Sequence, residues 1–229
     1  MPDRPKCVVL LSGGLDSATC LSIAVSLGFD PCALTVLYGQ RHQVEIDAAK
    51  RVAGSMGVLD HRFVSVDLNQ IGGSALTADI AVPKGRDEKE MSNDIPITYV
   101  PARNTVMLAI ALGFAEVVSA QDIFVGVNAV DYSGYPDCRP EYIQAFESLA
   151  ALATKAGVEG NPTRIHAPLI HMTKPEIIRR GLDLGVDYSL THSCYDPDDQ
   201  GRACGQCDSC IIRTKAFEAL GMCDPATAR

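Results

Sequence analysis

The sequence predicts an α/β fold in which helices cover both faces of a doubly wound parallel sheet. Short β-rich runs alternate with longer helical patterns along residues 1–130, which is typical of parallel strands joined by helical crossovers. The strand-like runs carry few charges, as expected for a sheet buried on both faces. With 229 residues, 47% of them hydrophobic, we expect residues 1–229 to form one domain with an appended segment at about 190–225.

Each element has its own local signal. Strands are expected at β-rich apolar runs, namely 7–11, 33–38, 62–67, 123–127 and 165–169. Helices are expected where apolar residues recur at helical spacing, namely 17–27, 44–56, 103–119, 141–155, 173–184 and 209–220. Thr173 and Glu176 form a capping-box pattern. Residues 69–97 show no sustained period, so they are either a solvated surface excursion or a lid over a site.

Composition and charge narrow the classes of partner. The net charge of −8 disfavours nucleic-acid binding, in which neutralisation of phosphates dominates the attraction. Nothing in the sequence has the apolar length of a membrane span or the pattern of a signal peptide. Nine cysteines, an odd number, favour a reducing compartment over a disulfide framework. We therefore expect a cytoplasmic protein without nucleic-acid or membrane partners.

The sequence SGGLDS, at 12–17, lies where the first strand should turn into the first helix. The free N–H groups and the dipole of a helix start attract anions, and glycines let the backbone approach a ligand closely. The spacing matches neither a Walker A loop nor a dinucleotide fingerprint. Asp16 would repel a bare phosphate, so it indicates either Mg²⁺ carried on the phosphates or a helix cap.

Four cysteines crowd near the C-terminus. Cys204, Cys207 and Cys210 follow one another at intervals of three residues, and Cys194 precedes them by ten positions. Four thiolates suit one tetrahedral, structural Zn²⁺, with an iron–sulfur cluster as the rival and buried, unliganded cysteines as the third possibility. The cysteines at 7, 20, 32 and 223 stand in apolar contexts and are expected in the core.

A third group of polar residues follows the strand at 123–127. Asp131 and Asp137 could accept hydrogen bonds from amino and ring N–H groups, while Tyr132 and Tyr135 could stack on a flat heterocycle. A tyrosine-rich surface turn explains these residues equally well. If this strand neighbours the first one, both loops face one site, because ligands of open parallel sheets bind beyond the carboxyl ends of the strands. Arg103, at a helix start, could bind a carboxylate or phosphate.

SGGLDS resembles the pyrophosphate loop (PP-loop) of the ATP pyrophosphatase superfamily, whose members transfer AMP to an oxygen of the substrate. The resemblance implies a Rossmann-like sheet of the adenine nucleotide alpha hydrolase-like type and Mg²⁺ near Asp16. It also implies that ATP is bound by Leu11, Ser12, Gly13, Gly14, Leu15, Asp16, Ser17, Ala18 and Thr19.

Further segments along the chain are similar to the 7-cyano-7-deazaguanine synthase family: YGQRH, YVPARN, GVNAVDYSGYPDCRP, THSCY and GRACGQCDSC. Two positions depart from the family pattern, Leu11 in place of phenylalanine and Ala216 in place of glycine. The resemblance implies an ATP-dependent C–N ligase of queuosine biosynthesis. It would convert 7-carboxy-7-deazaguanine and ammonia into the nitrile through an adenylated carboxylate and an amide.

The same resemblance implies roles for individual residues. Asp16, Ser17, Arg103 and Asp131 would act in catalysis, and the deazaguanine would be bound by Asp131, Tyr132, Tyr135 and Asp137. One structural zinc and a homodimer are also implied. The alternatives are a PP-loop tRNA-modifying ligase or thiolase and a nucleotide-binding sensor. The acidic balance disfavours the ligase or thiolase, and the Asp- and Tyr-rich loop disfavours the sensor.

Overall fold

The computed structural model describes residues 4–39, 44–92, 95–128 and 135–226. Five parallel strands form one sheet in the order β3-β2-β1-β4-β5. Their bounds are β1 (Lys6–Leu10), β2 (Asp30–Leu37), β3 (Asp60–Ser65), β4 (Asp122–Phe124) and β5 (Arg164–His166). The chain starts at the centre, runs to one edge and then returns to fill the other side. The predicted doubly wound parallel sheet is therefore confirmed.

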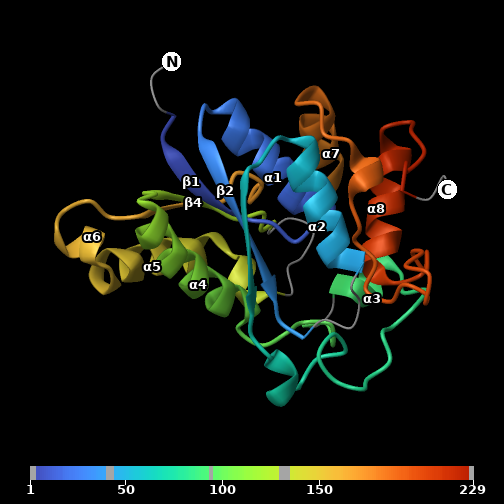
Figure 1. Ribbon diagram of the computed structural model, residues 1–229. Coiled ribbons are helices and arrows are strands. Elements are labelled where there is room, and N and C mark those ends of the chain that lie inside the picture. Colours follow the sequence, from blue (N-terminus) through green and yellow to red (C-terminus); the bar gives the residue numbers. More distant parts are fainter. Residues whose placement is uncertain (1–3, 40–43, 93–94, 129–134, 227–229) are drawn as a thin grey trace.

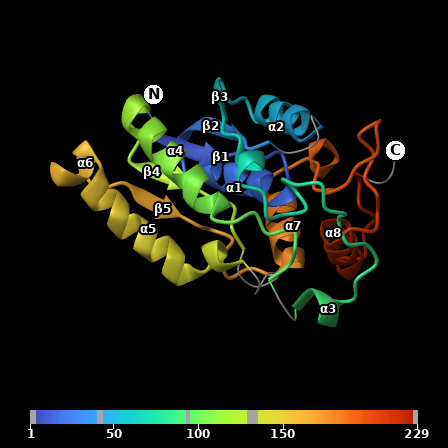
Figure 2. The ribbon, with the colours of Figure 1, turned by 90° about the horizontal axis from the view of Figure 1, so that it is seen from below.

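Helices cover both faces of this sheet (Figures 1 and 2). The α-helices are α1 (Leu15–Ser26), α2 (Val44–Ser55), α3 (Glu88–Ser92), α4 (Arg103–Val118), α5 (Pro140–Ala153), α6 (Lys155–Val158), α7 (Lys174–Asp183) and α8 (Asp208–Ala219). Three short 3₁₀ turns are η1 (Leu68–Gln70), η2 (Pro136–Cys138) and η3 (Tyr188–Leu190). The capping box at Thr173 and Glu176 forms as predicted.

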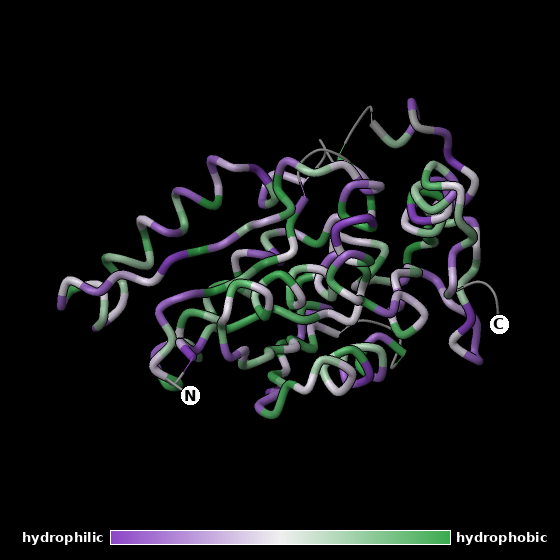
Figure 3. Tube along the Cα trace, turned by 90° about the horizontal axis from the view of Figure 1, so that it is seen from above, coloured by the Kyte–Doolittle hydropathy of each residue, from purple (hydrophilic) through white to green (hydrophobic). Residues whose placement is uncertain are grey.

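Alternation along β1 divides the hydrophobic core into two layers. Cys7 and Val9 point to the cluster that includes α1, α2, α7 and α8. Val8 and Leu10 point to the opposite cluster, which is built with α4 and α5. Successive side chains of a strand face opposite ways, so a strand covered on both sides is apolar throughout. Hydrophobic residues accordingly gather along the middle of the molecule (Figure 3).

Two strands are shorter than their apolar runs predict. The strand expected at 123–127 ends at Phe124, and Gly126 then passes close to α1, where a Cβ atom would lie 3.1 Å from the carbonyl carbon and oxygen of Asp16. The strand expected at 165–169 ends at His166, shortly before Pro168, which has no N–H to donate to a ladder. The proline thus ends the second strand early, and the first ends just before the close approach of Gly126 to α1.

The prediction of a helix at 141–155 is also wrong at the C-terminal end of that helix. Thr154 adopts an extended backbone with φ −119° and ψ 152°, which separates α5 from α6. Its hydroxyl donates to the Ala150 carbonyl at 2.8 Å and accepts from Gly157 N at 3.0 Å. Threonine favours helix N-caps because its oxygen can satisfy a free N–H group of the next helix. Apolar spacing alone did not reveal this break.

A buried ion pair between Arg213 and Asp224 links residues 191–193, which precede the cysteine loop, to the C-terminal end of the described chain. Arg213, on α8, donates through Nε to Asp224 at 2.7 Å and through Nη2 to the same carboxylate at 3.0 Å. The same guanidinium donates to Thr191 Oγ1 at 2.8 Å and to Ser193 Oγ at 3.3 Å. The side chains of Arg213 and Asp224 are only 7% and 2% exposed, so neither charge can be solvated by water instead.

We expect Asp224→Ala to lower the free energy of unfolding by about 3–5 kcal/mol, because removal of one partner leaves a buried charge uncompensated. Urea denaturation followed by circular dichroism measures this. Glu159→Gln is the matched control, since Glu159 and Lys155 lie 3.8 Å apart with side chains 58% and 80% exposed. Exposed pairs contribute about 0–1 kcal/mol. Equal losses in both variants would contradict the anchoring role.

Candidate active site

A cavity of about 260 Å³ opens at the carboxyl ends of β1 and β4, which are neighbours in the sheet. This is the switch point of the strand order, where parallel sheets bind ligands. Of the residues predicted from the sequence, it is lined by Leu11, Ser12, Gly14, Leu15, Asp16, Ser17, Arg103 and Tyr135. The first loop and the described part of the third loop therefore face one site. Gly13, Ala18 and Thr19 are buried and do not line the cavity.

Hydrogen bonds preshape the loop at 12–17. Ser12 N donates to Ser17 Oγ at 3.2 Å, and Ser17 Oγ donates to the Gly14 carbonyl at 3.0 Å. Gly13 has φ +83°, and a Cβ atom there would lie 2.4 Å from Ala49 N of α2. Only glycine fits this contact, since it combines a left-handed backbone with close approach of another main chain. The loop is thus fixed against α2 before any ligand arrives.

The carboxylate of Asp16 is held by a lysine from a distant helix. Lys174 Nζ donates to Asp16 Oδ1 at 2.9 Å and to Oδ2 at 2.8 Å. The side chains are 11% and 31% exposed for Lys174 and Asp16 respectively, and both residues line the cavity. Lys174 is the first residue of α7, whose N-terminus therefore points at the same place. The site thus places one cation and one anion at the loop.

The loop is also tied to the segment that leads into the cysteines. His192 N donates to the Gly13 carbonyl at 2.9 Å, and Leu15 N donates to Ser193 Oγ at 3.4 Å. Cys194 follows directly. Ser193 was not predicted as a site residue, because a serine in a loop carries no local signal of its contact with a residue 178 positions away.

Arg103 is presented by an unusual helix start. Ala102, the N-cap of α4, has φ 54° and ψ 23°, and its N–H donates to the Tyr99 hydroxyl at 3.1 Å. A left-handed conformation costs a non-glycine residue about 1–3 kcal/mol and is found where function requires it. The guanidinium lies 5.7 Å from the centre of the Tyr38 ring, within range of a cation–π contact. The strained turn therefore directs a cation into the cavity.

The third loop places its two described residues differently. Tyr135 lines the cavity, with its ring centre 5.6 Å from that of Tyr99. Asp137 is buried, and its Oδ2 accepts from Asn104 N at 3.0 Å, so this carboxylate holds the start of α4. Asn104 Nδ2 donates to Cys138 Sγ at 3.2 Å. Asp131 and Tyr132 lie outside the described residues.

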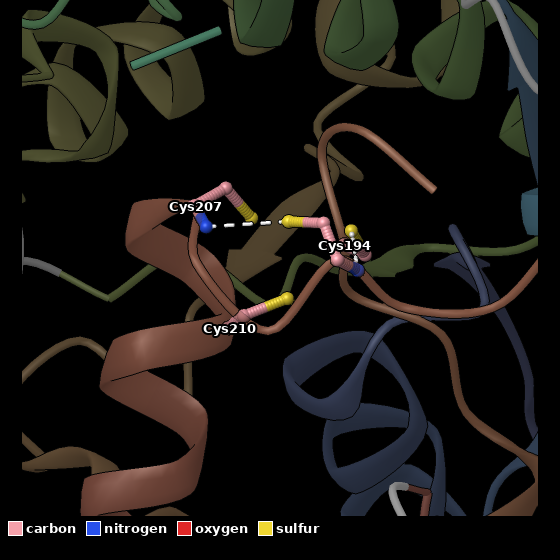
Figure 4. Close-up of side chains that lie close together, drawn as sticks. Cys194, Cys207 and Cys210 are labelled. Carbon is pink, nitrogen blue, oxygen red and sulfur yellow. Dashed lines mark hydrogen bonds between the residues drawn. The ribbon is translucent and has the colours of Figure 1, made fainter. Parts of the chain in front are cut away.

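The four predicted cysteines converge on one point. The Sγ atoms of Cys194, Cys204, Cys207 and Cys210 all lie within 4.8 Å of one another. Figure 4 shows the three labelled thiols turned toward one another, two of them from the start of α8. Sulfurs around one zinc at about 2.3 Å stand about 3.8 Å apart, so the set fits a single tetrahedral ion. The prediction of a four-cysteine group that could hold a metal is confirmed.

Backbone N–H groups point at these sulfurs. Cys204 N donates to Cys194 Sγ at 3.2 Å, Cys207 N to Cys204 Sγ at 3.3 Å and Tyr195 N to Cys207 Sγ at 3.5 Å. Donors around a thiolate stabilise its negative charge and orient it for a metal. Of the other cysteines, those at 7, 20 and 32 are buried as predicted, whereas Cys223 is exposed and that prediction was wrong.

The segment at 69–97 packs onto this four-cysteine group. Ala75 and Val82 are buried in the cluster formed with Cys194, Cys207 and Cys210. None of the described residues between 69 and 97 lines the cavity at the loop of residues 12–17. A wholly solvated excursion is therefore excluded, and the described part of the segment covers the cysteines instead.

Charged residues fasten the segment in place. Lys84 forms an isolated antiparallel bridge with Cys207, and its Nζ lies 2.8 Å from Asp196 Oδ2. The guanidinium of Arg86 donates two hydrogen bonds to Asp208, whose side chain is 2% exposed. These contacts join the segment to both ends of the cysteine loop, so its order depends on that loop.

A family profile described as "Queuosine biosynthesis protein QueC" matches residues 6–221. The chain belongs to the QueC family. The resemblance drawn from the motifs is therefore confirmed. A relative in Myxococcus xanthus named 7-cyano-7-deazaguanine synthase is 66% identical over 220 residues, which is 96% of each chain. A relative of the same name in Paramagnetospirillum magneticum is 66% identical over 219 residues, again 96% of each chain.

Solved structures are more distant from this QueC-family chain. A 4-thiouridine synthetase in complex with RNA and ATP aligns with a TM-score of 0.46 and 23% identity, over 79% of this chain and 41% of that chain. Within the described residues of the QueC-family chain, no helix is long and apolar enough to cross a bilayer.

Proposed function

We propose that this chain converts 7-carboxy-7-deazaguanine and ammonia into 7-cyano-7-deazaguanine with the consumption of ATP. The observation that carries the proposal is the meeting of a phosphate loop, the Asp16–Lys174 pair and Arg103 in one cavity. The chain belongs to the QueC family, and relatives 66% identical to it are named 7-cyano-7-deazaguanine synthase. This supports the assignment of 7-carboxy-7-deazaguanine as the substrate. The complete reaction replaces both carboxylate oxygens by one nitrogen.

The chemistry needs activation because a carboxylate oxygen is a poor leaving group. Transfer of AMP to the carboxylate makes that oxygen leave as AMP when ammonia attacks, which gives an amide. A second activation, at the amide oxygen, lets loss of AMP and a proton give the nitrile. The chain's part is to hold the reactants in line and to stabilise charge, which accounts for much of catalysis in such transfers.

The residues of the loop divide this work. The preshaped backbone and hydroxyls of Ser12 and Ser17 would hold the leaving pyrophosphate at the helix start. Mg²⁺, bound with ATP near Asp16, would neutralise phosphate charge. Lys174 would turn from Asp16 to a phosphate oxygen when the nucleotide binds. Arg103 would bind the carboxylate or the α-phosphate, because its cation faces the same cavity.

The third loop would select the deazaguanine. Tyr135 offers a ring for stacking at the cavity wall, and Asp131 and Tyr132 keep their proposed roles as base-binding residues. Asp137 would act indirectly, as a positioning residue that fixes Asn104 and the start of α4. Zinc held by the four thiolates would order the segment that carries His192 and Ser193 to the loop.

Sulfur transfer, as in a PP-loop thiolase, is the weaker candidate. Cys138 is the one cysteine among the described residues that line the cavity. Burial raises the pKa of its thiol to about 11, so it stays protonated and unreactive near pH 7. A nucleotide-binding sensor would not need the Asp16–Lys174 pair and Arg103 together in one cavity. We also expect a homodimer in the reducing cytoplasm.

The direct test incubates purified, zinc-replete protein with Mg-ATP, ammonium and 7-carboxy-7-deazaguanine. Mass spectrometry should show the nitrile, with an amide intermediate at early times and AMP and pyrophosphate as the products of ATP. Omission of each substrate in turn is the control. Failure to form nitrile under these conditions would overturn the proposal. Metal analysis should give one zinc per chain, and size-exclusion chromatography with light scattering reports the dimer.

A further inference from the structure

Glu45 brings a second carboxylate into the cavity, from an element that the motifs did not point to. It lies in the first turn of α2 and lines the same cavity as Asp16 and Arg103. Its backbone is part of the contact with the phosphate loop, since a Cβ atom on Gly13 would come within 2.7 Å of the Glu45 carbonyl oxygen. The residue is thus fixed beside the place where an acyl adenylate would form.

Among the described residues, no hydrogen bond or ion pair engages the Glu45 side chain. The carboxylate of Asp16, in contrast, is held by both oxygens on Lys174. Asp137 is held by the main chain of Asn104. Within the described residues, Glu45 is therefore the one of these three carboxylates that no hydrogen bond holds, and it faces the cavity.

The surroundings of Glu45 bring the pKa of its carboxyl close to neutral pH. Burial raises the pKa of its carboxyl to about 7, and the Arg103 cation opposes part of that rise. Carboxylates whose pKa lies near the working pH are suited to take up and release protons.

Two other ionisable groups of the cavity, Tyr38 and Cys138, are less suited to this role. Burial raises the pKa of Tyr38 to about 12 and that of Cys138 to about 11, so both stay protonated near pH 7. The charged and titratable side chains that face this space are, besides these, Asp16, Arg103, Tyr135, Lys174, His192 and Tyr195.

We propose that Glu45 is the ammonium-binding base of this site, which accepts a proton from NH₄⁺ and delivers NH₃ to the acyl adenylate. This inference rests on the proposed function. It assigns a residue to the attack by ammonia (the ammonia half of the reaction), whereas the loop and Arg103 serve adenylation by ATP (the nucleotide half).

Ammonium gives one proton to the Glu45 carboxylate and becomes ammonia. The nitrogen lone pair then forms the bond to the acyl carbon, the bond from that carbon to the oxygen of AMP breaks, and AMP leaves with the electron pair. The second proton lost by nitrogen goes to AMP or to water, and Glu45 returns its own proton to solvent. The charge of Arg103 acts on Glu45, and a cation nearby also lowers the pKa of a bound ammonium, which favours transfer of its proton to Glu45.

The test is Glu45→Gln, which keeps the shape and removes the base. General-base catalysis contributes about 10²–10⁴-fold, so we expect kcat/KM for ammonium to fall by about 10²-fold or more. Adenylation, followed as pyrophosphate exchange into ATP that depends on the deazaguanine acid, should be unchanged. Hydroxylamine is largely unprotonated at neutral pH, so the variant should turn it into hydroxamate as fast as the wild type does.

The pH profile gives an independent readout. In the wild type, kcat/KM for ammonium should rise through about pH 7 as Glu45 ionises, on top of the rise due to free ammonia. Glu45→Gln should lose the first rise and keep the second. Asp47→Asn is the matched control, since Asp47 lies on the same turn of α2 with a side chain 52% exposed. It should behave as the wild type.

Folding of the variant can be checked directly. Folding raises the pKa of the Glu45 carboxyl from 4.5 to about 7. Ionised Glu45 therefore destabilises the folded state, and this cost is fully present above about pH 7. Glu45→Gln should therefore melt no lower than the wild type at pH 8.

Three results would overturn the proposal. Ammonium kinetics equal to the wild type would show that Glu45 is not the base. Loss of pyrophosphate exchange would place it in the nucleotide half. A raised KM for the deazaguanine acid without rescue by hydroxylamine would make it a purine-binding residue. A wild type that forms no nitrile would instead refute the proposed function itself.

Discussion

Asp16→Asn should lower turnover by about 10²–10³-fold, the usual loss when one preorganised charge is removed from the reacting centre. The variant keeps a polar oxygen that can still accept from Lys174 Nζ, which now lies 2.8 and 2.9 Å from the two carboxylate oxygens. It loses the negative charge that would hold Mg²⁺ beside the phosphates. Steady-state formation of nitrile and AMP at saturating ATP measures the effect.

Stability must be measured beside activity, because the pair also joins α1 to α7. Loss of a charge-assisted hydrogen bond costs about 1.5–3 kcal/mol, so the variant should still be folded at 25 °C. Asp183→Asn removes the same charge from the exposed end of α7 and should leave turnover unchanged. Wild-type turnover in Asp16→Asn across a range of Mg²⁺ concentrations would refute the role assigned to this carboxylate.

Cys207→Ser should abolish binding of the proposed zinc and release the 69–97 segment from the protein surface. A closed four-thiolate site lends its binding free energy to folding, so the loop that supplies the ligands loses its order with the metal. Lys84 and Arg86 are fastened to that loop, through Cys207, Asp196 and Asp208. We expect trypsin to cut after both residues in the variant and to spare them in the zinc-replete wild type.

The core should survive this change, because the cluster around the cysteines is separate from the two clusters that flank the sheet. Local opening without global unfolding is common in such peripheral units. Chelation of the wild-type metal should reproduce the cleavage pattern. Cys223→Ser is the matched control, since this thiol is exposed and outside the cluster. Full zinc content in Cys207→Ser would contradict the ligand set.

Much of the fold was predictable because its signals are local. Apolar runs and helical spacing located the five strands and the six main helices, and Thr173 with Glu176 marked the start of α7. The errors occurred where another part of the chain intervened. β4 ends just before the close approach of Gly126 to Asp16, while the hydroxyl of Thr154 divides α5 from α6. Periodicity carries no information about either contact.

The candidate site was predictable in part for the same reason. The phosphate loop and the cysteines each lie within a short stretch, so spacing alone indicated their chemistry. Asp137, predicted to bind the substrate, accepts a hydrogen bond from the backbone of Asn104, a contact that spacing does not indicate. Glu45 gave no signal, since an acidic residue in the first turn of a helix is ordinary. Its importance arises from the packing of α2 against Gly13.

The sequence by itself determined which chemical groups this protein has: a loop for an anion, four thiols for one metal and a parallel sheet to carry them. Only the tertiary structure decided what those groups face. It paired Asp16 with Lys174 across 158 positions, tied the loop to Ser193 and laid the 69–97 segment on the cysteines. The reason is physical, because propensity and spacing act within a few residues, whereas burial and charge pairing act wherever the folded chain brings groups together.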